Sequence, residues 1–167
     1  DQSALMRRYD LIKEICDSMI ELGWSPYQND HEDANGQFEM NWDFSDCLKT
    51  ADRHTFFKFM VKTLAEKHGL RATFMPKPLD DGQGSGMHTH MSLFQGDVNA
   101  FHDPNDEMGL SAIARKFMAG ILHHAPEFTA VTNQLVNSYT RMIAGYESHD
   151  YFSLARNNTS ALIRVPV

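Results

Sequence analysis

The stretch "GSGMHTHMSLF", residues 84–94, places two histidines two positions apart directly after a run of glycines. In an extended strand, residues two apart face the same way at a separation of about 6.6 to 6.8 Å. Neutral imidazole is a common metal ligand, so His88 and His90 could bind one metal, or place one nitrogen on a metal and the other on a bound anion. The alternative is a pair of polar residues on the exposed face of a strand.

Two carboxylates flank a predicted turn in "HEDANGQFE", residues 31–39. Glu32 precedes the turn at Asn35 and Gly36, and Glu39 follows it, so the two side chains could converge on one cation. Hard oxygen ligands suit Mg²⁺ or Mn²⁺, ions typical of phosphate chemistry, better than zinc. The alternative is a solvated polar face.

Glycines and arginines supply further candidate binding groups. The glycines of "DDGQGSG" let a ligand approach the backbone closely, although their order matches neither a P-loop nor a dinucleotide motif and also suits an ordinary flexible loop. The planar guanidinium groups of Arg141, Arg156 and Arg164 suit carboxylates or phosphates. The alternative for each arginine is a surface ion pair, which contributes little to stability.

These residues must be positioned by helices and strands that alternate along the chain. Apolar residues at helical spacing predict three helices, the first ended by a left-handed cap at Gly23 and the third ending before Pro126. The helices run from about Leu5 to the Gly23 cap, from about Ala51 to His68 with Phe57, Met60 and Leu64 on one stripe, and through Leu110, Ile113, Phe117 and Ile121.

Three segments resemble strands, and together with the helices they predict an α+β domain. Gln37 to Trp42 alternates polar and apolar residues, so Glu39 should point away from the core. The other two predicted strands are Leu70 to Met75, stopped by "PKP", and Met87 to Phe94.

Length and charge exclude several classes of protein. A chain of 167 residues is typical of about one domain, and its net charge of −7 argues against binding nucleic acid. No apolar stretch approaches the roughly 20 residues that cross a membrane, and the opening "DQSALMRRYD" lacks a signal-peptide core, so we expect a cytoplasmic protein without a membrane partner. Two cysteines, Cys16 and Cys47, offer no disulfide framework or CxxC metal site.

Four phrases in order resemble the catalytic domain of the glutamine synthetase family, from about Trp24 to Pro166: "HEDANGQFE", "GSGMHTHMSLF", "HHAPEFTAVTNQLVNSYTRMIAGYE" and "ARNNTSALIRVP". The resemblance implies a curved, mostly antiparallel sheet that carries the ligands on its concave face, with helices on the other. It also implies a two-step reaction: ATP phosphorylates the side-chain carboxylate of glutamate, and ammonia then displaces phosphate.

The resemblance also implies roles for individual residues. Glu32 and Glu39 would ligate the Mg²⁺ or Mn²⁺ ion that holds glutamate, and His88 the ion that holds the ATP phosphates. Glu147 would lie on a mobile flap and help draw a proton from ammonium. The remaining implied binding residues are Gly84, Gln83 and Arg141 for glutamate, and His90, Arg156 and Arg164 for the nucleotide or its phosphates.

Two positions depart from the family pattern. Thr159 stands where the family usually has an arginine, which removes a cation expected on the transferring phosphoryl group and would cost on the order of a hundredfold in rate. Neighbouring Arg156 is the group that could compensate. Gln83 stands where an asparagine is usual, close to the glutamate-binding Gly84.

The resemblance covers only part of the family's catalytic domain. Residues 1–167 contain no counterpart of the family's small N-terminal domain, of its further metal-binding glutamates or of its C-terminal remainder. We therefore expect this piece alone to be inactive and prone to self-association. The intact parent is expected to form a homo-oligomeric ring with sites between subunits. Alternatives are the same chemistry with methylamine, a polyamine or another amine, and a non-catalytic paralogue that binds glutamate or nucleotide.

Overall fold

The computed structural model describes residues 2–142, 151–156 and 161–165, with the backbone alone for Gln2 and for 151–156. The chain divides into two compact units, Asp1–Gln83 and Gly84–Val167. None of the helices in the described residues combines the length and the apolar character needed to cross a membrane.

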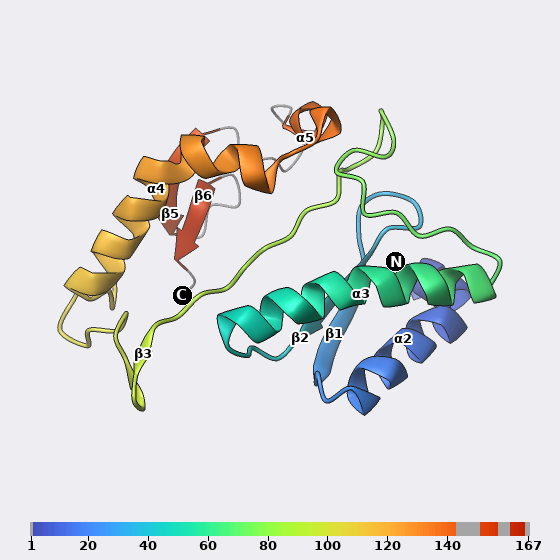
Figure 1. Cartoon of the computed structure of the whole chain (residues 1–167), viewed down its shortest axis with the longest axis horizontal. Coiled ribbons are helices and arrows are strands. Elements are labelled where there is room, and N and C mark those ends of the chain that lie inside the picture. The colour runs from blue at the N-terminus through green and yellow to red at the C-terminus, as the bar shows by residue number, and fades with distance from the viewer. Residues whose placement is uncertain (1, 143–150, 157–160, 166–167) are drawn as a thin grey trace. The chain divides into compact units, whose positions relative to one another are not determined.

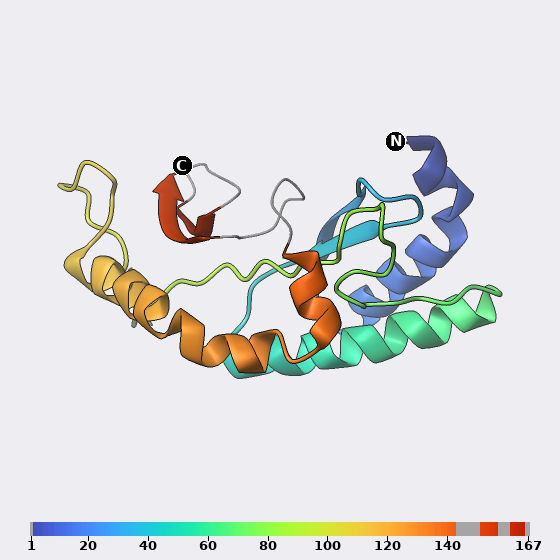
Figure 2. The same ribbon diagram turned by 90° about the horizontal axis from the view of Figure 1, so that it is seen from above.

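The first unit packs its two longer helices and a hairpin around one core. In chain order its elements are α1 (Gln2–Arg7), α2 (Tyr9–Glu21), β1 (Pro26–His31), β2 (Phe38–Trp42) and α3 (Cys47–Lys67). Figures 1 and 2 show α2 and the β1–β2 hairpin on the same side of α3. The core between these elements consists of Ile15, Met19, Trp24, Phe57, Met60 and Leu64.

The two helices predicted for this unit are present, with different boundaries. The first is interrupted at Arg8, whose backbone N–H bonds to the Leu5 carbonyl at 3.0 Å in a single turn. Gly23 has the predicted left-handed conformation, with φ of 72°. The second helix begins at Cys47, earlier than predicted, because the Asp46 carboxylate accepts a hydrogen bond from the Lys49 backbone N–H at 2.9 Å.

The predicted strand at residues 37–42 is confirmed as β2, which pairs antiparallel with β1. The register places Asp30 opposite Glu39, and it is irregular between Pro26 and Gln28. The predicted turn is also confirmed, because Gly36 has φ of 75° and the Gln37 N–H bonds to the Ala34 carbonyl at 3.0 Å.

Two predicted strands are largely wrong. Residues 70–75 form no strand, although Phe74 packs against the core of the first unit. Of residues 87–94, only Phe94 belongs to a strand, and Figure 1 shows the stretch before it as a trace without arrows. Both segments have strand-like composition, but residues 70–75 and 87–93 belong to no strand pair among the described residues, and pairing is what makes a strand.

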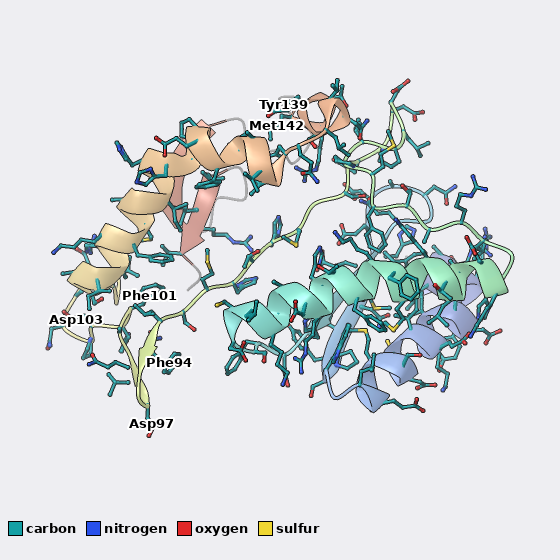
Figure 3. All side chains as sticks on the ribbon, viewed as in Figure 1. Phe94, Asp97, Phe101, Asp103, Tyr139 and Met142 are labelled. Carbon is teal, nitrogen blue, oxygen red and sulfur yellow. The ribbon has the colours of Figure 1, made fainter. Side chains whose placement is uncertain are left out.

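The second unit contains two short strand pairs and two helices: β3 (Phe94–Gln95), β4 (Val98–Asn99), α4 (Ala112–Thr132), α5 (Val136–Arg141), β5 (Tyr151–Arg156) and β6 (Ala161–Val165). The β3–β4 pair is antiparallel and turns at Gly96 and Asp97, the latter labelled at the hairpin tip in Figure 3. The β5–β6 pair is parallel. The α+β class is confirmed, with the described strands in three two-stranded sheets, two of them antiparallel.

The helix α4 differs from its prediction in its end and in its buried face. It begins where Ser111 caps the Ala114 N–H at 3.1 Å and continues through Pro126, which costs one backbone hydrogen bond without ending the helix. Its buried residues are Ala114, Met118 and Ala125. The predicted stripe residues Ile113 and Phe117 are 50% and 40% exposed, so the apolar face chosen from the sequence was wrong at these positions.

Candidate functional site

Three carboxylates share one face of the β1–β2 hairpin. Asp30 lies directly opposite Glu39, and two residues closer to the turn the Glu32 N–H bonds to the Gln37 carbonyl at 2.9 Å. Alternate residues of a strand share a face, so Asp30, Glu32 and Glu39 lie on the same side of the hairpin. The predicted convergence of Glu32 and Glu39 is therefore compatible with the register.

The opposite face of the hairpin fixes this orientation. Met40 and Trp42 pack against the core of the first unit, and the ring of Trp42 lies 5.1 Å from that of Phe57. His31 meets Phe38 edge to face on the same side, with ring centroids 5.4 Å apart. Because the apolar side is held against α3, the carboxylate side faces away from this core.

Hydrogen bonds from neighbouring side-chain amides orient two of the carboxylates. The Asn41 side-chain amide donates to Glu39 Oε1 at 2.9 Å, and the Gln28 amide donates to Asp30 Oδ2 at 2.5 Å. An ionised carboxylate has about four acceptor positions, so each of these groups retains capacity for a cation. Hard oxygen donors of this kind fit Mg²⁺ or Mn²⁺. Within the described part of the chain, however, no group of three or more His, Cys, Asp or Glu side chains is arranged to hold a metal ion.

The loop that leads to the glycine-rich stretch lies against the hairpin turn. Lys77 is buried and its ammonium group donates to the Gly82 carbonyl, which closes the loop on itself. A Cβ atom placed on Gly82 would stand 3.5 Å from Cβ of Ala34 and from Cβ of Leu79. The segments "HEDANG" and "PKPLDDGQ" are thus neighbours within the first unit, and Gln83, which is partly buried, ends it.

In the second unit, the structure brings the glycine-rich stretch to Arg141. This arginine is the last residue of α5, between Tyr139 and Met142, which Figure 3 labels. A Cβ atom on Gly86 would lie 2.8 Å from its terminal nitrogen Nη2. Gly84, two residues earlier, is partly buried. Two groups implied to bind glutamate, the glycine stretch and Arg141, are therefore adjacent.

The remaining predicted residues lie on other segments of the second unit. His88 and His90 are exposed on a segment without a strand partner, so the argument from strand alternation does not apply to them. Arg164 is exposed on β6 opposite Ala155, and Arg156 pairs with Val165 through the backbone of β5. Glu147 and Thr159 lie outside the described residues. The roles of all these residues remain predictions.

The sequence analysis missed two residues, Asp30 on the hairpin and Gly86 beside Arg141. Asp30 could have been found from the hairpin register, because a turn at Asn35 and Gly36 that pairs Glu32 with position 37 also pairs Asp30 with Glu39. Gly86 had no such signal, because its contact with Arg141 joins segments far apart in the chain.

Comparison with known proteins assigns the family. The sequence model described as "Glutamine synthetase, catalytic domain" matches residues 1–167. The chain belongs to the glutamine synthetase family. It is 58% identical to the glutamine synthetase of Rhizobium meliloti (strain 1021) over 99% of its own length, and it spans about 40% of the length of that relative.

Solved structures that are similar to this chain agree with this assignment. The chain is similar to GmaS in a complex with ADP, at 52% identity and a TM-score of 0.88, over 98% of this chain and 40% of that one. It is similar to the Plasmodium falciparum glutamine synthetase at 30% identity and a TM-score of 0.90, over 94% of this chain and 30% of that one. The fold is therefore that of a portion of the glutamine synthetase catalytic domain.

Proposed function

We propose that the full-length protein carrying this chain is an ATP-dependent ligase that joins ammonia to the γ-carboxylate of glutamate. The observation that carries the proposal is the match of all 167 residues to the glutamine synthetase catalytic domain. In the first step the glutamate carboxylate attacks the terminal phosphorus of ATP, and ADP leaves. In the second, ammonia attacks the carbonyl carbon of the γ-glutamyl phosphate, and phosphate leaves.

The hairpin geometry supports the metal-binding part of this proposal. Glu32 and Glu39 share an outward face and present hard oxygen donors, so they would hold Mg²⁺ or Mn²⁺ beside glutamate. A divalent cation supplies charge neutralisation for the carboxylate and phosphoryl groups when it is bound. His88 would contribute a ligand to the ion that accompanies the ATP phosphates.

The second unit supplies the proposed glutamate-binding groups. Arg141 lies against the glycine-rich stretch, where a guanidinium fork and nearby backbone N–H groups would bind a substrate carboxylate. Gly84 and Gln83 are also proposed to bind glutamate, by analogy with the family motif. Arg164, His90 and Arg156 are proposed to bind the phosphates or the nucleotide, and Glu147 to accept a proton from ammonium.

Further parts of the proposal concern the whole protein. Residues 1–167 are proposed to be part of a catalytic domain, with an additional N-terminal domain and a C-terminal remainder in the parent. The parent is proposed to be a cytoplasmic homo-oligomeric ring with its sites between subunits. The chain alone is proposed to be inactive, because further metal-binding glutamates and the N-terminal domain that would complete a site are expected outside residues 1–167.

A second candidate keeps this chemistry with methylamine, a polyamine or another amine as the nucleophile. The phrase "YQNDHEDANGQFEMNW" favours it, whereas "GYE" favours ammonia. A third candidate is a paralogue that binds glutamate or nucleotide without turnover, which Thr159 in place of the usual arginine favours.

The experiment is an amine panel with the full-length protein. Glutamate, ATP and Mg²⁺ are supplied with ammonium, methylamine or putrescine, and phosphate release is measured together with the γ-amide product by mass spectrometry. Reactions that lack glutamate or the amine are the controls.

Phosphate release that requires both glutamate and an amine supports the ligase, and the amine with the highest kcat/KM identifies the nucleophile. Preference for methylamine or putrescine would replace ammonia with the second candidate. Tight glutamate or ATP binding without product under every condition would overturn the ligase proposal in favour of the binding paralogue.

A further inference from the structure

Gly86 differs from the left-handed glycines in the reason why a side chain is excluded. Left-handed conformations, with φ between 60° and 75°, account for Gly23, Gly36, Gly69, Gly96 and Gly109. Gly86 is not among the glycines with a positive φ, so a left-handed conformation does not account for it. The local chain geometry therefore does not explain glycine at this position.

The space beside Gly86 is taken by Arg141. A Cβ atom on Gly86 would lie 2.8 Å from Nη2 and 3.6 Å from Cζ of the guanidinium group. Real Cβ atoms essentially never show contacts under 3.0 Å, so one of the two groups would have to move. The guanidinium is the far end of a flexible side chain, whereas the Gly86 backbone is not, and the guanidinium is therefore the group that would shift.

We propose that Gly86 is a positioning residue for Arg141. The missing side chain gives the guanidinium its place beside the glycine stretch, in the orientation that binds a glutamate carboxylate. This inference rests on the proposed function for the role of Arg141, and on the contact geometry for the role of Gly86. A methyl group at position 86 would then disturb substrate binding while leaving the fold intact.

Gly120 provides a matched control in the same unit. It lies within α4, and a Cβ atom on it would meet nothing within 4 Å. The substitutions Gly86→Ala and Gly120→Ala therefore add the same methyl group, but only the first one reaches a guanidinium. A general effect of adding alanine would appear in both variants.

The experiment compares the two variants in the full-length protein. We expect Gly86→Ala to raise KM for glutamate by about tenfold to a hundredfold, the effect of losing a charged hydrogen bond. The kcat, the KM for ATP and Tm should stay close to those of the parent, because an interaction equal in ground and transition states affects KM alone. Gly120→Ala should leave KM for glutamate unchanged.

A double substitution tests whether the effect passes through Arg141. Arg141→Lys removes the planar fork, so Gly86→Ala should add little to KM in that background if both changes act on the same contact. Fold-increases in KM that multiply, as they do for two independent substitutions, would overturn the inference. A fall in Tm and in every kinetic parameter of Gly86→Ala would also overturn it, since that pattern reports general unfolding.

A chemical readout separates this inference from the proposed function. Phenylglyoxal modifies accessible arginines, and peptide mapping by mass spectrometry gives the modification rate at Arg141. A displaced guanidinium should react faster in Gly86→Ala than in Gly120→Ala, even if the parent proves to have no ligase activity. Equal rates at Arg141 in the two variants would refute the positioning role, whatever the enzyme assays show.

Discussion

The carboxylates of the hairpin differ in how closely they can approach one another. Residues directly opposite on antiparallel strands have Cβ atoms about 4.5 to 5.5 Å apart, whereas diagonal neighbours are about 7 to 8 Å apart. Asp30 is therefore nearer to Glu39 than Glu32 is, and a cation beside Glu39 would also reduce repulsion from Asp30. The register thus makes Glu39 the central carboxylate of the face.

Removing the charge of Glu39 should weaken metal binding. We expect Glu39→Gln in the full-length protein to raise the Kd for Mn²⁺ by at least about tenfold, because a neutral amide replaces a carboxylate ligand. Isothermal titration with Mn²⁺ measures this change. The matched control is Glu66→Gln, which alters an exposed glutamate on α3. An unchanged Kd in Glu39→Gln would contradict the assignment of this residue as a ligand.

At this scale, local sequence information was sufficient for some residues and insufficient for others. The turn at Asn35 and Gly36 and the outward orientation of Glu39 followed from nearby residues, and both are confirmed. Asp30 was missed because its role depends on the partner strand. The contact of Gly86 with Arg141 depends on tertiary packing, which composition and periodicity do not specify.

The buried face of α3 was predictable from the sequence, whereas helix ends and the buried face of α4 were not. Phe57, Met60 and Leu64 are buried on α3 as expected, because helical periodicity is a local property. The boundaries failed where one side chain or one packing contact decides them, at the Asp46 cap and at Pro126 inside α4. Strand prediction failed more often, because a strand needs a partner that the local sequence does not identify.

Glu14 joins α2 to the end of α3, and this link should depend on pH. Its carboxylate accepts a hydrogen bond from His68 Nε2 at 2.7 Å and lies 3.6 Å from the Lys67 ammonium. These contacts, the His68 hydrogen bond first, lower the pKa of Glu14 below its usual value. The stabilisation is therefore complete above the unfolded-state pKa and is lost as pH falls through the lower folded-state pKa.

We expect Glu14→Gln to lower Tm slightly at pH 6 and to have a smaller effect at pH 3, where the parent has also begun to lose the charged contact. Thermal unfolding followed by circular dichroism at the two pH values gives both differences. Glu21→Gln, at the end of the same helix, is the control. Equal changes in Tm for Glu14→Gln at both pH values would show that the ionised contact does not contribute.

At the scale of the whole chain, α3 has apolar residues on two faces. Phe57, Met60 and Leu64 are buried in the core of the first unit, while Leu48, Phe56 and Phe59 recur at helical spacing elsewhere on the helix and are 70%, 45% and 64% exposed. A helix that is apolar on more than one face is typical of the interior of a larger protein. Contact with further parts of a larger protein would therefore stabilise the exposed apolar face of α3.

The isolated chain of residues 1–167 should self-associate through such surfaces. We expect its apparent mass in size-exclusion chromatography with light scattering to rise with concentration, because exposed apolar area favours association. Replacing Leu48 and Phe59 by serine should reduce this increase, since both side chains are exposed. A chain that stays monomeric at every concentration would show that these side chains do not drive association.

The two sides of the β1–β2 hairpin carry separate tasks, and this separation has an evolutionary consequence. Met40 and Trp42 pack the hairpin against the core. On the outward side, Gln28, Asp30 and Asn41 are the polar neighbours of the two glutamates. Substitutions on the outward side carry little folding penalty, because they disturb none of the packing beneath. New ligand preferences can therefore arise there by drift without a compensating change elsewhere.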